Sequence, residues 1–181
     1  DPTVRELERR LATEFGFERG LFAPSGTQAN LIALLVHCQR GDEVLVGMEA
    51  HTYKYETGGA AVLGSIQPQA IPNAVDGSLP LEALAKALKP DDQHFARTRL
   101  LALENTWHGR VLPQPYILEA TSWARSHGLS MHLDGARLFN AVVATGMPAH
   151  ELAQPFDTVS VCLSKGLGAP VGSVLLCPDS L

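Results

Sequence analysis

The stretch PYILEATSWARSHGLSMHLDGARLFNAVVA, residues 115–144, decides the fold that this sequence predicts. Residues 115–127 predict a helix, because Pro115 suits a first helical turn and Gly128 suits the position after a helix end. Residues 130–133 predict a short buried strand, and residues 136–144 predict another helix. Helices and strands that alternate at this spacing favour a parallel sheet joined by helical crossovers.

The same alternation extends over the rest of the chain. Further helices are expected at residues 2–15, 27–38 and 79–88, and further strands at 20–23, 43–48, 66–71, 99–103, 158–163 and 173–177. A sheet of this kind is stable when helices cover both of its faces. We therefore predict one α/β domain with a mostly parallel sheet and helices on both faces.

Composition excludes several classes of protein. The net charge of −5 over 181 residues, without a basic run, gives no support to nucleic-acid binding. No apolar stretch approaches the roughly 18 residues of a membrane span. The three cysteines are widely separated and odd in number, which predicts free thiols in the cytoplasm and neither a disulfide framework nor a metal site. Because the chain begins at Asp1, without methionine, we expect a contiguous piece of a longer protein.

Two charged residues follow predicted strands. Lys165 lies in SKGLG (residues 164–168), directly after the strand at 158–163, and Asp134 follows the strand at 130–133. Ligands of open α/β sheets bind beyond the carboxyl ends of the strands. A lysine that forms a Schiff base and a carboxylate that pairs with a pyridine nitrogen are the groups that pyridoxal 5'-phosphate requires. Taken alone, Lys165 fits a solvated turn residue better.

Two other strand ends carry candidate ligand-binding residues. In PSGT (residues 24–27), Gly26 allows a close backbone approach, and the hydroxyls of Ser25 and Thr27 with the free N–H groups of a helix start can hold a phosphate. Taken alone, this segment fits a simple helix N-cap better. His51 could lie flat on a cofactor ring or be an ordinary surface histidine, and its neighbours do not decide between the two.

Seven motifs together resemble the L-threonine aldolases of the fold-type I pyridoxal phosphate superfamily. They are DPTV (1–4), PSGTQAN (24–30), RGDEV (40–44), ETGGAA (56–61), LENT (103–106), HLDGARL (132–138) and CLSKGLG (162–168). The resemblance implies that residues 1–181 form the large, aspartate aminotransferase-like domain that binds pyridoxal phosphate. An N-terminal segment and a small C-terminal domain would lie outside this chain. It also implies a homo-oligomer, either a dimer or a tetramer.

The resemblance implies a role for each matched residue. Lys165 would hold the cofactor, Asp134 would keep its ring nitrogen protonated, and His51 would stack on its ring. Arg137 would bind the cofactor phenolic oxygen or the substrate carboxylate. The phosphate would be bound by Gly26 and Thr27, with Ser25 and Ser164 as helpers.

The sequence departs from the family pattern after LENT. Many members have a histidine there, near the cofactor, whereas this chain has Trp107 followed by His108. One alternative is that His108 reaches the site by a local shift and acts in catalysis. The other, which we prefer, is that Trp107 packs against the pocket while His51 or water handles protons.

The activity that the resemblance implies is retro-aldol cleavage of a small amino acid, L-threonine or L-allo-threonine, to glycine and an aldehyde. A related lyase acting on phenylserine or another β-substituted amino acid would use Lys165, Asp134 and Thr27 equally well. A non-catalytic scaffold of the same fold is less favoured, because a scaffold needs neither Lys165 nor Asp134.

Overall fold

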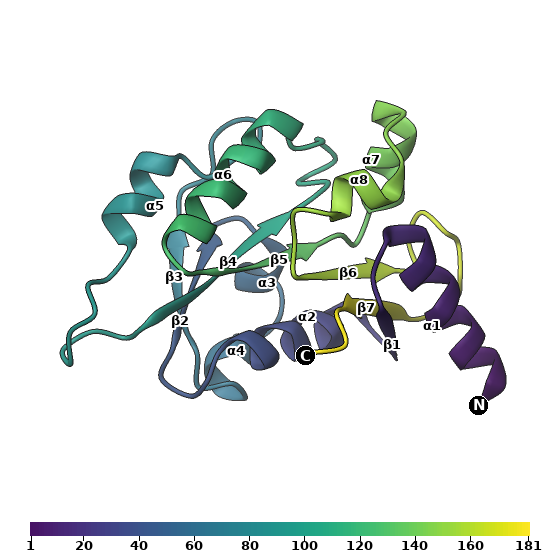
Figure 1. The fold of residues 1–181 in the computed structure, drawn as a ribbon, viewed down its shortest axis with the longest axis horizontal. Coiled ribbons are helices and arrows are strands. Elements are labelled where there is room, and N and C mark those ends of the chain that lie inside the picture. The colour runs from purple at the N-terminus through teal and green to yellow at the C-terminus, as the bar shows by residue number, and fades with distance from the viewer.

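The computed structural model describes all of residues 1–181, and its centre is one seven-stranded sheet (Figure 1). The strands are β1 (Arg19–Ala23), β2 (Glu43–Gly47), β3 (Gln67–Ile71), β4 (Thr98–Glu104), β5 (Ser130–Asp134), β6 (Thr158–Cys162) and β7 (Ser173–Cys177). They lie in the order β1-β7-β6-β5-β4-β2-β3. Strand β7 is antiparallel to both of its neighbours, whereas all other pairs are parallel. The prediction of a mostly parallel sheet is confirmed.

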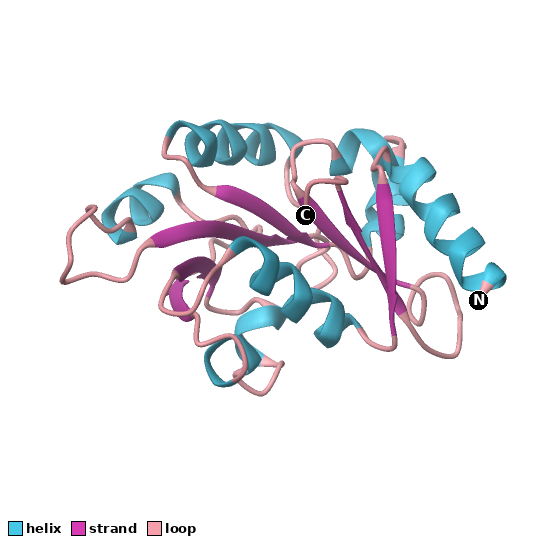
Figure 2. Cartoon of the chain, turned by 60° about the horizontal axis from the view of Figure 1, so that its bottom comes forward, coloured by secondary structure: helices cyan, strands magenta, loops and turns pink.

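Helices cover both faces of the sheet (Figure 2). They are α1 (Pro2–Phe15), α2 (Gly26–His37), α3 (His51–Lys54), α4 (Gly59–Val62), α5 (Leu81–Ala87), α6 (Gln114–Ser126), α7 (Leu138–Thr145) and α8 (Ala149–Ala153). The larger core joins one face of the sheet to α1, α5, α6, α7 and α8. Two smaller cores join the other face to α2 and α4.

Alternation along the central strands decides which side chains meet α2. On β5, Met131 and Leu133 belong to the larger core. Because successive side chains point to opposite faces of a strand, His132 and Asp134 lie on the α2 face. Both polar side chains are buried there. The fold thus places ionisable groups between the sheet and one helix.

Some helices differ from those predicted. Helices α3, α4 and α8 were not predicted, because four or five residues are too few to show a helical period. Helix α7 begins at Leu138 and not at residue 136. The reason is local: the Asp134 carboxylate accepts a hydrogen bond from the Ala136 N–H at 3.1 Å, which holds the intervening backbone in a turn.

The carboxyl ends of six of the seven strands, all except β7, share one edge of the sheet. Strand β1 runs parallel to β6 because both are antiparallel to β7. The segments after β1, β2, β4, β5 and β6 therefore emerge at the same edge, and each carries a candidate residue. None of the helices has both the length and the apolar composition that crossing a membrane requires.

Candidate active site

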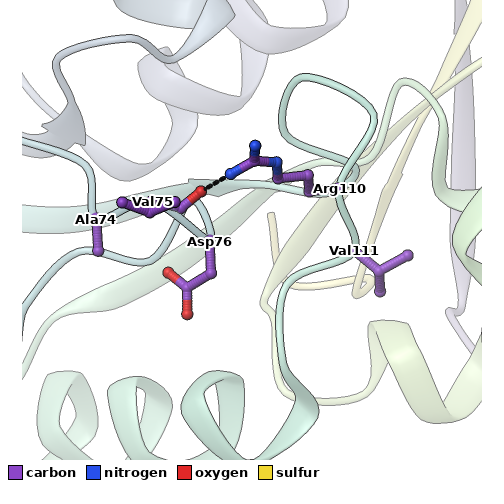
Figure 3. Close-up of a pocket in the computed structure, with 5 residues that line it drawn as sticks. All are labelled: Ala74, Val75, Asp76, Arg110 and Val111. Atoms are coloured by element: carbon purple, nitrogen blue, oxygen red, sulfur yellow. Dashed lines mark hydrogen bonds between the residues drawn. The ribbon is translucent and has the colours of Figure 1, made fainter.

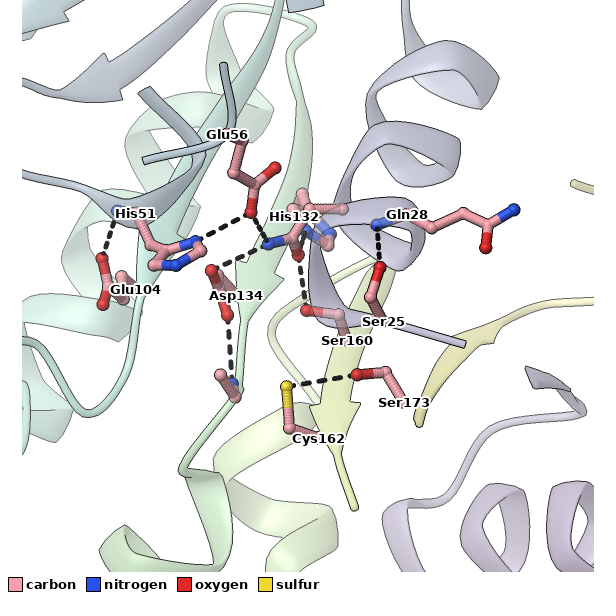
Figure 4. A network of polar contacts seen from close by, with 12 residues as sticks. Ser25, Gln28, His51, Glu56, Glu104, His132, Asp134, Ser160, Cys162 and Ser173 are labelled. Atoms are coloured by element: carbon pink, nitrogen blue, oxygen red, sulfur yellow. Dashed lines mark hydrogen bonds and ion pairs between the residues drawn. The ribbon is translucent and has the colours of Figure 1, made fainter. Parts of the chain in front are cut away.

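Asp134 is the fixed centre of the candidate site (Figure 4). It ends β5 and is only 2% exposed. Its Oδ2 accepts a hydrogen bond from Asn30 Nδ2 at 2.9 Å, and its Oδ1 accepts one from the Ala136 N–H at 3.1 Å. Two N–H donors hold the oxygens of a buried carboxylate in fixed positions. The side chain is therefore oriented by the fold before any ligand binds.

His51 is held at both its backbone and its ring. Its backbone N–H donates to Glu104 Oε2 at 2.8 Å, and its ring Nδ1 lies 2.9 Å from Glu56 Oε1. The hydrogen bond with Glu56 raises the pKa of His51 above its ordinary value. Asn30 Nδ2 donates to the same Glu56 oxygen at 2.8 Å, so one amide connects His51 and Asp134. Ring atom Nε2 of His51 has no hydrogen-bond partner.

Glu104 is a site residue that the sequence analysis missed. It ends β4 directly opposite Asp134 in the sheet register. Burial, with the nearby Asp134 carboxylate, raises the pKa of Glu104 to about 7. A carboxyl group with such a pKa exchanges protons near neutrality. The signal that could have identified Glu104 is its place at a strand end, in the same position as Asp134.

The start of α2 forms an anion-binding geometry. Ser25 is the N-cap, and its Oγ accepts a hydrogen bond from the Gln28 N–H at 3.2 Å. The N–H groups of Gly26 and Thr27 have no acceptor within the helix. A Cβ built on Gly26 would lie 2.9 Å from Cys162 Sγ, so only glycine fits between α2 and β6. Two free N–H groups, two hydroxyls and the positive end of the helix dipole suit a phosphate.

Lys165 lies just after β6, in a turn where its carbonyl accepts a hydrogen bond from the Gly168 N–H at 3.0 Å. The side chain is half-buried and takes part in no hydrogen bond or salt bridge. Its positive charge nevertheless acts on His51 and Glu104, opposing the rise in the pKa of each. The ammonium group is thus close to the other candidate residues and free to bond. Ser164, beside it, is exposed.

Arg137 lies at the same edge of the sheet, directly before α7. It is exposed and is the N-cap residue of that helix, although its side chain makes no capping hydrogen bond. The guanidinium group takes part in no salt bridge. Its position leaves it available to an anionic group.

His108 lies in a turn after β4 and takes no part in the hydrogen-bonded network of Asn30, His51 and Asp134. The backbones of Trp107 and Arg110 pair across the turn at 2.9 and 2.8 Å. Figure 3 shows Arg110 donating to the carbonyl oxygen of Val75, beside a cavity of about 550 Å³ that is also lined by Ala74, Asp76 and Val111. His108 is exposed, and its ring makes only an edge contact with Trp107, with centroids 4.5 Å apart.

Trp107 packs against the segment that precedes α5. A Cβ built on Gly77 would lie 2.7 Å from Trp107 Cε3, so the ring covers this glycine closely. Together with Glu104 and Ala50, Trp107 also lines a small cavity. The ring thus fills space beside the Glu104 side chain.

His51, Glu56 and Asp134 could be mistaken for a metal site, because their potential ligand atoms lie within 4.8 Å of one another. However, Asn30 Nδ2 donates to both Glu56 Oε1 and Asp134 Oδ2. Its hydrogens therefore point at the oxygens that would coordinate a cation. This arrangement suits an organic ligand beside the carboxylates better than a metal ion between them.

The fold and these residues define an α/β protein with a candidate ligand site at the carboxyl edge of its sheet. The chain belongs to the beta-eliminating lyase family, which matches residues 1–181. It is 57% identical over 176 residues to the low specificity L-threonine aldolase of Escherichia coli (strain K12), covering 97% of this chain and 53% of that protein. It is 46% identical to low-specificity L-threonine aldolase 1 of Arabidopsis thaliana, with 99% and 52% covered. The chain thus spans about half the length of the curated relatives it matches.

Solved structures agree with these relatives. The threonine aldolase of Leishmania major is 25% identical with a TM-score of 0.79, covering 87% of this chain and 46% of that one. A Listeria monocytogenes EGD-E protein, provisionally assigned as an L-allo-threonine aldolase, is 26% identical with a TM-score of 0.84, with 99% and 49% covered. The resemblance and fold class predicted from the motifs are therefore confirmed.

Sequence reasoning also missed several residues that hold the site together, all of them buried and polar. Asn30 and Glu56 lie inside two of the family motifs, PSGTQAN and ETGGAA, which was the available signal. His132 and Ser160 alternate with apolar residues on their strands, and alternation alone does not distinguish a solvated face from a buried polar one.

Proposed function

We propose that the complete natural protein containing this chain is a pyridoxal phosphate-dependent lyase that cleaves L-threonine and L-allo-threonine to glycine and acetaldehyde. The observation that carries the proposal is the convergence of Lys165, Asp134 and the start of α2 at one edge of the sheet. The similarity to low specificity L-threonine aldolases over almost the whole chain supports this choice of substrate.

The donor set fits pyridoxal phosphate. The free N–H groups of Gly26 and Thr27 suit its phosphate, and the close contact between Gly26 and Cys162 keeps a side chain out of that position. The buried carboxylate of Asp134 suits a protonated ring nitrogen. Lys165 Nζ, which has no partner of its own, suits the aldehyde. When bound, the cofactor supplies an electron sink for the bond that breaks at the substrate α carbon.

The protein contributes orientation and proton handling. Asp134 keeps a positive charge favourable at the ring nitrogen because its two oxygens are fixed by N–H donors. Glu56 occupies Nδ1 of His51, so Nε2 is the ring atom left to accept a proton from a substrate hydroxyl. The exposed guanidinium of Arg137 is suited to a carboxylate of the substrate or an anionic oxygen of the cofactor.

A second candidate is β-elimination or cleavage of another β-substituted amino acid, such as phenylserine. The matched family is named for β-elimination, which supports testing this second reaction. Lys165, Asp134 and Thr27 would serve either reaction, since both begin with the same anchoring of cofactor and substrate. The choice between the two reactions depends on the parts of the site that select the side chain of the substrate.

The test is a comparison of substrates with the complete protein and added pyridoxal phosphate. We expect turnover of L-threonine and L-allo-threonine, with glycine and acetaldehyde formed in equal amounts. Faster release of pyruvate and ammonia from serine or cysteine would favour the β-eliminating alternative. Binding of the cofactor without turnover of any amino acid would favour a scaffold.

We also propose that the complete protein is a cytoplasmic homo-oligomer, a dimer or tetramer, in which residues 1–181 form the large cofactor-binding domain. Large apolar side chains such as Val62 and Leu63 on α4 and its end are 75% and 70% exposed, and such residues are often covered by a partner. Light scattering is expected to give at least twice the mass of one chain. An active monomer at the assay concentration would refute the assembly.

A further inference from the structure

Asn30 is the residue through which the parts of the candidate site are joined. It lies on α2, one helical turn after the proposed phosphate-binding segment, and is only 1% exposed. Its amide hydrogen-bonds with side chains of β5, of β6 and of the segment that follows α3. A buried amide is stable only when its donors and acceptor are paired. The pairing of Asn30 is complete, and it involves four different side chains.

The nitrogen side of the amide holds two carboxylates. Nδ2 donates to Asp134 Oδ2 at 2.9 Å and to Glu56 Oε1 at 2.8 Å. An amide nitrogen has two hydrogens, and each is used once. The same Glu56 oxygen binds His51 Nδ1 at 2.9 Å. Asn30 therefore separates two negative charges with donors and connects Asp134 to His51.

The oxygen side fixes which way the amide points. Oδ1 accepts from Ser160 Oγ at 2.6 Å and lies 3.2 Å from His132 Nε2. If the amide were rotated by half a turn, its oxygen would face two carboxylate oxygens and its nitrogen would face the Ser160 hydroxyl. That orientation loses two donors to charged groups, so the observed one is strongly preferred.

His132 extends the chain of hydrogen bonds away from the site. Burial lowers the pKa of His132 to about 3, so the ring is neutral. Because an amide oxygen cannot donate, Nε2 of this ring carries the hydrogen, and Nδ1 accepts from the Thr158 hydroxyl at 2.9 Å. Thr158 Oγ1 then accepts from His37 Nε2 at 2.9 Å, at the far end of α2. A chain of hydrogen bonds through His132 and Thr158 thus links Asn30 to His37, the last residue of its own helix.

We propose that Asn30 is a positioning residue, whose amide N–H groups hold Asp134 toward the cofactor ring nitrogen and hold Glu56 toward His51. The inference rests on the proposed function, because it assigns Asp134 and His51 to a bound pyridoxal phosphate. Asn30 itself touches no reacting atom. The titratable groups that face it are Asp134, Glu56 and His132; the charges of His51, Glu104 and Lys165 lie just beyond them.

Asn30→Asp is the most informative substitution, because it keeps the size of the side chain and replaces the donors by an acceptor. The new carboxyl group would lie beside those of Asp134 and Glu56. Because like charges repel, the three groups together would bind a proton near neutrality. We expect the complete protein to bind pyridoxal phosphate about tenfold or more weakly at about pH 8. At about pH 6 the deficit relative to the parent should shrink by at least about threefold, because a bound proton restores one donor.

The measurement is the dissociation constant for pyridoxal phosphate at each pH, from quenching of tryptophan fluorescence. Thermal unfolding of the cofactor-free variant provides a second readout, and its midpoint should fall more steeply than that of the parent from about pH 6 to about pH 8. Ser160→Ala is the matched control, since it disturbs the oxygen side of the same amide while leaving both donors. Its dissociation constant for pyridoxal phosphate should differ from that of the parent by less than about threefold, and this difference should not depend on pH.

Gln154→Glu makes the same chemical change at an exposed position after α8, and its cofactor affinity should equal that of the parent. Asn30→Ala covers the case in which Asn30→Asp does not fold. It removes the donors without adding charge, so its deficit should be about tenfold and the same at both pH values. Parent-like affinity in Asn30→Ala, or an equal deficit at both pH values in Asn30→Asp, would overturn the proposal.

The two proposals fail in different ways. If the parent binds pyridoxal phosphate and cleaves threonine while both Asn30 variants match it, only the positioning role is wrong. If the parent does not bind the cofactor, the proposed function is wrong and the role of Asn30 toward the cofactor is wrong with it. In that case the unfolding data still show whether Asn30 separates Asp134 and Glu56.

Discussion

The two sides of the candidate site differ in how completely their polar atoms are paired. On the side formed by α2 and β5, Asn30, Asp134 and His132 are buried and bonded to one another. The other side is formed by the segment after β6 and the first residues of α2. There Lys165 has no side-chain partner, and the N–H groups of Gly26 and Thr27 are also free. The difference shows which part of the site the fold completes and which part is left for a ligand to complete.

This comparison has an energetic reason. A buried polar group without a partner is costly, so the fold must pair the groups beneath α2. An exposed amine or N–H group bonds to water at little cost until a ligand replaces that water. Substitutions on the open side should therefore affect ligand binding alone, whereas substitutions on the closed side should affect both binding and stability.

The largest expected effect is at Lys165. Lys165→Ala should abolish covalent attachment of pyridoxal phosphate and nearly all turnover, with little change in the melting temperature, because the side chain has no hydrogen bond or salt bridge to lose. Borohydride reduction followed by peptide mapping of the parent should place the cofactor on Lys165. Lys86→Ala, at an exposed site on α5, is the control and should behave as the parent. A label found on Lys54, Lys86 or Lys89 would show that the anchor is elsewhere.

Asp134→Asn should reduce turnover by orders of magnitude, because an amide stabilises a protonated ring nitrogen poorly. It should also destabilise the protein. Asparagine has one oxygen, so either Asn30 Nδ2 or the Ala136 N–H loses its acceptor, at a cost of about 1–3 kcal/mol. Urea unfolding measures this cost, with the exposed Asp91→Asn as control. Near-normal activity would place the essential carboxylate elsewhere.

The third comparison is between His51 and His108. His51→Ala should lower turnover by about 10² or more, because it removes the ring and a candidate base together. His108→Ala should lower it by less than about tenfold, since that side chain is exposed and has no hydrogen bond. In the parent, the pH profile should show a limb above the ordinary value of 6.5, because Glu56 raises the pKa of His51. A larger loss at His108, with disappearance of that limb, would make His108 the functional histidine.

The smallest effect concerns Glu104 and the pH dependence of stability. Its folded-state pKa of about 7 exceeds the ordinary 4.5, so the native state binds more protons between these values. The free energy of unfolding contributed by Glu104 therefore falls as pH rises through this window. Glu104→Gln keeps an acceptor for the His51 N–H and removes the titration. Its cofactor-free form should gain stability relative to the parent as pH rises from 4.5 to about 7.

His132 changes the free energy of unfolding in the opposite direction over part of the same pH range. Its pKa is lowered to about 3, so its contribution to stability is lost as pH falls from 6.5 toward 3. His132 contributes equally to the free energy of unfolding of the parent and of Glu104→Gln. Its contribution therefore cancels when the two free energies are subtracted at each pH. A difference that does not vary with pH would show that Glu104 keeps an ordinary pKa.

The sequence by itself determined the architecture and the positions of the main candidate residues. Short apolar runs predicted every strand of the sheet to within one residue at each end, because buried parallel strands need continuous apolar segments. Strand-end positions singled out Lys165, Asp134, His51 and the segment at 24–27. Helices of four or five residues escaped prediction, since they are held by tertiary contacts and not by a helical period.

Only the tertiary structure decided how those residues are connected. Asn30, Glu56, His132 and Ser160 are separated by up to 130 residues in the chain, as Asn30 and Ser160 are, yet they form one hydrogen-bonded group. No local pattern encodes such a pairing, because it depends on α2 crossing the sheet over β5 and β6. The pKa of Glu104 has the same origin: it is raised by burial and by a carboxylate on the neighbouring strand, and both exist only in the folded chain.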